Sequence, residues 1–305
     1  MGGSLVDGVP VVSKESLFAS GQSDNEFVFI WTVNFEGNSQ EKMISELYKE
    51  GIFHWYNITL EDRNQICHPL NHDHEQFYKE NRNLILHVLE SLYDEQSVEE
   101  YIEYMRTYIE NSTWRLKEAD TVCKYFFGGQ GDKREKIYMH LDDEVWLNCG
   151  CHVGDTIFNF YRNGLKAKRI IAIDDDEYNI RMIRDNLTYL KNEDQETVKV
   201  MCTHIDKDMD WLQVLNGDKL TLINADIEGA ELDLVKNMID IIRHDRPVLA
   251  LCLYHKPQDV VSIPLFLMDN IDNYCYIVRK YSSYRHTYRN YELVMYAVPK
   301  ERTVI

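Results

Sequence analysis

Residues 145–156 read Val145-Trp146-Leu147-Asn148-Cys149-Gly150-Cys151-His152-Val153-Gly154-Asp155-Thr156, and a second apolar run ends in Asp174-Asp175-Asp176. An apolar strand, a glycine turn, a helix and a second strand that ends in acids are the parts of a β-α-β unit. This order suits a ligand that contains a nucleoside. Glycine lets the backbone approach the ligand, the helix N-terminus offers N–H groups, and the acid can accept hydrogen bonds from ribose hydroxyls. A tight turn with no ligand also uses glycine, and that alternative stays open at this point.

The spacing of the two glycines narrows the ligand class. Gly150 and Gly154 form Gly-x-x-x-Gly, whereas a dinucleotide site uses Gly-x-Gly-x-x-Gly to cradle a pyrophosphate. The spacing therefore argues against an NAD-dependent oxidoreductase.

From Val145 onward, apolar strands and helices alternate, which predicts an α/β fold with a mostly parallel sheet covered on both faces. Two further β-rich runs near the end predict an antiparallel hairpin at the sheet edge. The predicted strands span 145–149, 169–174, 197–203, 220–226, 248–254, 274–281 and 291–298, and the helices span 153–163, 177–189 and 229–243.

The first half of the chain has a different pattern. Strands at 9–12, 26–34 and 52–58, with helices near Ser16 and at 40–50, predict a small α/β unit. Acidic helices follow at 74–93, 97–111 and 112–124, and Ser97 fits a capped helix start. Because Gly128 to Gly131 reads as a linker, we predict an N-terminal region at 1–127 and a second domain at 132–305.

Composition limits the partners and the compartment. A net charge of −18 over 305 residues disfavours nucleic acid and anionic membrane surfaces, which attract basic proteins. The chain shows no apolar stretch of membrane-spanning length and no signal-peptide pattern. Its seven cysteines lie mostly in apolar strands, which is typical of free thiols in a reducing compartment. We therefore expect a cytoplasmic protein that binds neither nucleic acid nor membrane.

Metal and redox chemistry have weak support in the sequence. Cys67-His68 and the run His72 to Glu75 offer ligand types, but their spacing matches no closed zinc pattern, so we predict no metal. Cys149 and Cys151 could suggest redox chemistry, and buried thiols in a turn are the alternative that we favour.

Several segments from Tyr125 to the C-terminus resemble the FkbM family of S-adenosylmethionine-dependent methyltransferases. The most specific is the run from Asp226 to Glu231, which reads Asp-Ile-Glu-Gly-Ala-Glu. The other resembling segments are Tyr125-Phe126, Asp143-Glu144-Val145, Asn148 to Thr156, Tyr254 to Pro257, Ile263-Pro264, Arg279, Tyr281-Ser282 and Glu292 to Pro299. The region before Tyr125 is similar to an N-terminal extension of some bacterial members.

The resemblance implies a Rossmann-like class I methyltransferase that binds S-adenosylmethionine. It implies a small-molecule acceptor, with O-methylation of a sugar or secondary metabolite expected and N-methylation of a small molecule or peptide as the alternative. A homodimer is compatible with it. The implied cofactor-binding residues are Asn148, Cys149, Gly150, His152, Gly154, Asp155, Asp174 and Asp226, and the implied catalytic residues are His255, Asp226 and Glu228.

Each catalytic candidate also has a structural alternative. His255 follows a predicted strand at the ligand-binding edge, where an imidazole can take a proton near neutral pH, but it could equally be a loop residue. Glu228 and Glu231 open a helix, where the helix dipole favours acids without any catalytic role.

Three positions depart from the usual family pattern. Asn148 stands where Asp is usual, Asn224 where Lys is common, and Asp174 to Asp176 where Glu-Pro-Asp is usual. These departures leave open a non-catalytic module that kept the fold while its cofactor pocket drifted.

Overall fold

The computed structural model describes residues 4–6, 9–11, 29–31, 55–57, 72–109, 137–282 and 291–304. The chain divides into two compact units, residues 1–70 with 286–290, and residues 71–285 with 291–305. The predicted helices near Ser16 and at 40–50 and 112–124, the Gly128–Gly131 linker and the Cys67-His68 pair lie outside the described residues. The predicted domain boundary at 127–132 lies there too.

The described residues of the first unit form two small strand pairs. Strands β1 (Ser4–Val6) and β2 (Val9–Val11) pair antiparallel, and β3 (Phe29–Trp31) and β4 (Trp55–Asn57) pair parallel. Strands β2, β3 and β4 lie inside segments that the sequence predicts to be strands.

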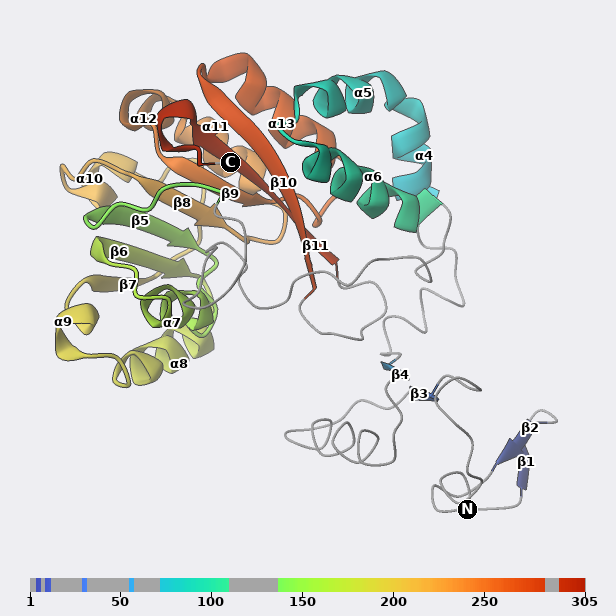
Figure 1. Ribbon diagram of the computed structural model, residues 1–305. Helices are drawn as coiled ribbons and strands as arrows, with labels where there is room; N and C mark the ends of the chain where they lie inside the picture. The colour runs from blue at the N-terminus through green and yellow to red at the C-terminus, as the bar shows by residue number, and fades with distance from the viewer. Residues whose placement is uncertain are drawn as a thin grey trace. The chain divides into compact units, whose positions relative to one another are not determined.

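The second unit is built on a seven-stranded sheet with the order β10-β11-β9-β8-β5-β6-β7 (Figure 1). The parallel strands are β5 (Glu144–Cys149), β6 (Ala167–Asp174), β7 (Val198–Cys202), β8 (Leu222–Ala225) and β9 (Val248–Cys252). Strands β10 (Tyr274–Ser282) and β11 (Tyr291–Pro299) form the antiparallel hairpin, and β11 pairs with β9. The predicted mostly parallel α/β sheet with a C-terminal hairpin is therefore confirmed.

Helices cover both faces of this sheet because alternate strand residues point to opposite sides. Leu147 faces a core with α10 to α13 and α4 to α6, whereas its neighbour Trp146 faces a core with α7 and α8. The helices are α4 (His72–Glu80), α5 (Arg82–Ser91), α6 (Glu95–Ile109), α7 (Asp155–Arg162), α8 (Glu177–Leu187), α10 (Trp211–Leu215), α11 (Glu231–Asn237), α12 (Ile239–Asp245) and α13 (Asp259–Asn270), with the short α9 (Asn192–Gln195) and the 3-10 turn η1 (Lys300–Arg302).

Helix α6 packs against β10 (Figure 1) through a buried polar contact. Arg279, only 4% exposed, donates to Asp94 and to Ser97 Oγ, and Ser97 Oγ also accepts from the Val278 N–H at 2.9 Å. The helix begins at Glu95, and Asp94 Oδ1 accepts from the Ser97 N–H at 2.7 Å. The predicted start at Ser97 is therefore wrong, because Asp94 makes the capping bond while the Ser97 side chain binds the sheet.

Helix α13 is absent from the sequence prediction, and Pro264 inside it explains why. Proline has no N–H to donate to the carbonyl four residues earlier, which here is that of Val260. The Tyr101 hydroxyl from α6 donates to that carbonyl at 2.6 Å. A partner distant in the sequence thus satisfies the acceptor that proline leaves without its helical bond.

Two other predicted helices are each divided in the structure. The segment predicted at 229–243 forms α11 and α12, which meet at Met238, and the segment at 74–93 forms α4 and α5. Within the described residues, no helix is both long enough and apolar enough to cross a membrane.

Candidate functional site

A cavity of about 990 Å³ opens where the strand order reverses. The chain runs outward from β5 to β6 and β7 and then returns to β8 on the other side of β5. Open α/β sheets bind ligands at the carboxyl ends of strands at such a point, and the volume is within the range of small-molecule sites. The cavity is lined by residues that follow β5 to β9 and by Tyr281 and Glu292 of the hairpin.

The glycine turn after β5 is packed tightly against the segment after β8. Gly150 has φ +75°, and a Cβ atom there would lie 1.9 Å from the Asp226 carbonyl oxygen. Gly154 has φ +86°, and a Cβ atom there would lie 2.7 Å from Ile183 Cγ1. Both positions therefore require glycine for space and for backbone conformation. Gly150 lines the cavity. Gly154 does not line it and packs against Ile183 of α8.

Asp174 ends β6 at the cavity, as the sequence predicts. Its Oδ2 accepts from the His152 N–H at 2.8 Å, and its Oδ1 accepts from the Asp176 N–H and from Asn179 Nδ2. These donors fix the carboxylate across from the glycine turn. His152 and Asp155 line the same cavity, so the structure brings these three predicted residues together with Gly150.

Asn148 and Cys149 are buried, and neither lines the cavity. Asn148 Oδ1 accepts from Asn224 Nδ2 at 3.1 Å, and Asn224 Oδ1 accepts from Trp146 Nε1 at 2.6 Å. Burial raises the pKa of the thiols of Cys149 and Cys151, to about 12 for Cys151. Both are therefore protonated at neutral pH, which disfavours thiolate redox chemistry.

The three predicted catalytic residues lie together beyond β8 and β9. Asp226 and Glu228 line the cavity, and the Glu228 side chain is 92% exposed. His255 lies behind them, with its side chain 7% exposed, and it is not among the lining residues. The sequence thus identified the cluster, but the position of His255 differs from that of a residue that contacts an acceptor.

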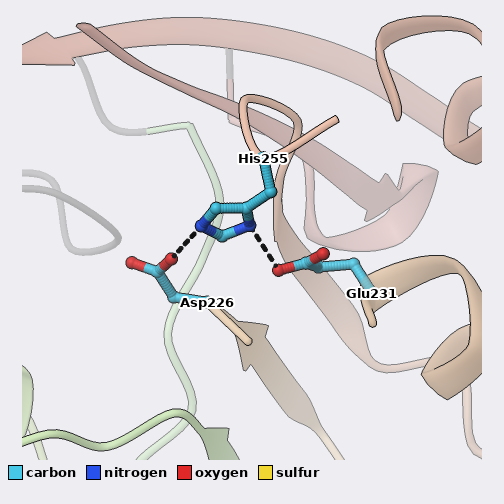
Figure 2. Close-up of side chains that lie close together, drawn as sticks. All are labelled: Asp226, Glu231 and His255. Carbon is cyan, nitrogen blue, oxygen red and sulfur yellow. Dashed lines mark hydrogen bonds and ion pairs between the residues drawn. The ribbon is translucent and has the colours of Figure 1, made fainter. Parts of the chain in front are cut away.

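His255 is held between two carboxylates (Figure 2). Its Nε2 lies 3.2 Å from Asp226 Oδ1, and its Nδ1 lies 2.9 Å from Glu231 Oε1. Burial opposes a charged ring, but the hydrogen bonds and charges of Asp226 and Glu231 outweigh it and raise the pKa of His255 to about 10. The ring is therefore an imidazolium near neutral pH, a poor base.

The same three side chains have ligand types that bind metals, and their ligand atoms lie within 4.8 Å of one another. The two carboxylates contact different nitrogens of the ring (Figure 2). One ion can bind only one of these nitrogens, which leaves the carboxylate beside the other nitrogen on the far side of the ring. The arrangement suits two shared protons better than a metal.

Several cavity residues were not predicted from the sequence. Tyr254 lines the cavity, and its hydroxyl donates to Asp226 Oδ1 at 2.7 Å. Its place directly after β9 is the one local signal that could have identified it. The other unpredicted polar lining residues include Thr156, Asn159, Asn179, Thr203, His204, Asp233, Lys256 and Glu292.

Comparisons with known proteins agree with this architecture. Residues 133–278 match the family model described as the methyltransferase FkbM domain. The crystal structure of methyltransferase FkbM from Methylobacillus flagellatus KT aligns with 97% of this chain and 80% of its own at 18% identity and a TM-score of 0.66, which supports a shared fold. A search of curated proteins found no match.

Weaker likenesses include a precorrin-6y C5,15-methyltransferase from Geobacter metallireducens GS-15. It covers 52% of this chain and 82% of its own at 15% identity, and its TM-score of 0.37 is too low to support an inference. The assignment to a protein family rests on the family model, and the seven-stranded sheet agrees with it. Residues 133–278 of this chain match the methyltransferase FkbM domain.

Proposed function

We propose that this protein transfers a methyl group from S-adenosylmethionine to a hydroxyl of a small acceptor, such as a sugar or secondary metabolite. The observation that carries the proposal is the cavity itself. It brings the glycine turn, Asp174 and the Asp226 segment together around one cavity, in a domain that matches a methyltransferase family.

The residues on the β5 and β6 side fit the cofactor. Gly150 lets the backbone line the cavity without a side chain, and Asp174 is fixed by three donors. A carboxylate offers about four acceptor sites, so Asp174 retains capacity for a ribose hydroxyl. Gly150 and His152 would border the methionine part. When bound, S-adenosylmethionine supplies an electrophilic methyl group, with the C–S electron pair left on the thioether product.

The acidic residues of the cavity favour a hydroxyl-bearing acceptor. Asp226, Glu228, Asp233 and Glu292 line it, and the lining Lys256 has its Nζ engaged by the Gly229 carbonyl. Carboxylates accept hydrogen bonds from hydroxyl groups and repel anions. This lining supports a polyhydroxylated acceptor over one that carries a carboxylate or phosphate.

The departures from the family pattern at 148 and 224 support a retained site rather than a degraded one. These residues stand opposite each other on β5 and β8 and are joined by the hydrogen bond between their amides. A usual Asp at one position and Lys at the other would form an ion pair across the same strands. Two amides replace that pair with a neutral hydrogen bond. Asn148 does not line the cavity, and Asn224, which does, is held by its bond to Asn148.

Calorimetry with S-adenosylmethionine and with its demethylated product tests the cofactor assignment. We expect heat of binding from both, and no heat from either would contradict the proposal. Mass spectrometry of a metabolite extract incubated with enzyme and cofactor then tests the reaction. A product that is heavier by one methylene and carries the new methyl group on oxygen would identify O-methylation. A new methyl group on nitrogen would support the N-methylation alternative.

Replacing Asp174 by Ala should weaken cofactor binding. Hydrogen bonds to a charged group are worth about 1.5–3 kcal/mol, so we expect a loss of roughly one to two orders of magnitude in affinity. The control is Asp218→Ala, because Asp218 pairs with Lys168 and Arg169 and does not line the cavity. Titration calorimetry of both variants decides the matter: equal affinity in the Asp174 variant and wild type would remove Asp174 from the site.

A further inference from the structure

A chain of hydrogen-bonded groups leads from the cavity into the core beside α11. Asp226 Oδ1 accepts from the Tyr254 hydroxyl at 2.7 Å and faces His255 Nε2 at 3.2 Å. His255 Nδ1 then faces Glu231 Oε1 at 2.9 Å (Figure 2). Only Asp226 and Tyr254 of these four line the cavity. The acceptor can therefore contact Asp226 but not His255 or Glu231.

Glu231 is the unusual member of this chain. It is fully buried, its Oε1 also accepts from the Ile227 N–H at 2.8 Å, and its Oε2 is buried without a hydrogen-bond partner. A buried carboxylate is costly unless a cation offsets it. A protonated His255 supplies that cation, and the same ring places its second N–H against Asp226.

We propose that Asp226 takes the proton from the acceptor hydroxyl. Two groups position Asp226 for this role: Tyr254, through its hydrogen bond, and Glu231, which acts through the protonated His255. This assignment rests on the proposed function. As the acceptor oxygen forms its bond to the methyl carbon, its proton passes to the Asp226 carboxylate. His255 keeps both of its protons and orients Asp226, in place of the role of base that the sequence predicts for it.

Other ionisable groups lie near the ring. Glu228 Oε2 lies 3.8 Å from His255 Nε2. Lys256 follows His255 in the chain, and its N–H donates to Asp259 Oδ2 at the start of α13. Burial and the charge of Glu231 raise the pKa of Asp259 to about 6, and burial raises that of Tyr254 above its usual range. Loss of the His255 proton is thus separated from the titration of Asp259 on the acidic side.

The first experiment needs no acceptor. Imidazole ¹⁵N NMR of the full chain, followed from about pH 6 to about pH 11, measures the titration of His255. We expect His255 to keep both N–H protons until about pH 10. In Glu231→Gln the titration should move to lower pH, because the ring loses one of its two carboxylates. A wild-type His255 that titrates like an ordinary histidine would overturn the proposal, whatever the calorimetry with S-adenosylmethionine shows.

The second experiment uses methyl-labelled S-adenosylmethionine and the small-molecule fraction of a cell extract as the acceptor probe. Glu231→Gln should lower kcat with little change in cofactor affinity, and its loss of activity should begin at lower pH than in wild type. Glu193→Gln is the matched control, because Glu193 lies on α9 and does not line the cavity. If the activity of Glu231→Gln and that of wild type fall at the same alkaline pH, the positioning role is overturned.

Discussion

Replacing Gly150 by Ala should abolish measurable binding of S-adenosylmethionine. The added Cβ would meet the Asp226 carbonyl oxygen at 1.9 Å and its carbon at 2.8 Å. Backbone atoms cannot turn aside as a flexible side chain can, so β5 and β8 must separate at the point where the cavity opens. The variant thereby shifts both the cofactor wall and Asp226. Calorimetry measures the affinity, and thermal unfolding measures the accompanying loss of stability.

Gly164→Ala provides the matched control for this prediction. Gly164 has φ +73°, close to the +75° of Gly150, but an added Cβ would meet nothing within 4 Å. Both variants carry the cost of a left-handed alanine, about 1–2 kcal/mol, and only Gly150→Ala adds the clash. Gly164→Ala should be slightly less stable and bind the cofactor normally. Cofactor binding by Gly150→Ala at the wild-type level would show that the turn is not the cofactor wall.

The fold was largely predictable because its signals are local. Each parallel strand is a short apolar run that ends at a polar or glycine residue, and the hairpin strands are rich in β-branched and aromatic residues. Helix α13 was missed because sequence pattern alone reads Pro264 as a helix breaker. The hydroxyl that donates to its Val260 carbonyl belongs to Tyr101, 159 residues earlier in the chain. The start of α6 was misplaced because Ser97 binds β10 instead of capping its own helix.

Some residues of the candidate site could likewise be identified from local sequence pattern, whereas others come together only in the fold. Gly150 and Asp174 could be identified because a strand, a turn and a second strand follow one another in the chain. The Asn148–Asn224 pair joins strands β5 and β8, and the Glu231–His255–Asp226 chain joins the segments after β8 and β9. These contacts can be known only once the strand order is known. The residues around His255 could therefore be named from the sequence. Which of them contact each other, and that His255 is protonated, could be known only from the structure.

The protonated His255 should also make folding stability depend on pH. Its pKa is about 10 in the folded chain against 6.5 for an ordinary histidine. The stabilisation is therefore complete below about pH 6.5 and is lost as the pH rises through about 10. The shift corresponds to a contribution on the order of 5 kcal/mol. The free energy of unfolding, measured by denaturant titration across this range, should fall more steeply for wild type than for His255→Gln.

The comparison between variants isolates this histidine from other groups that titrate in the same range. Tyrosines and lysines elsewhere contribute equally to wild type and to His255→Gln, so the difference between the two curves reports His255 alone. That difference should be largest below about pH 6.5 and should shrink steadily between about pH 6.5 and pH 10. His244→Gln is the matched replacement of a histidine outside the cluster, because the His244 side chain is 86% exposed. A gap between wild type and His255→Gln that stays constant with pH would mean that His255 is neutral in the folded chain, since only a proton held more tightly by the native state than by the unfolded state can produce the narrowing.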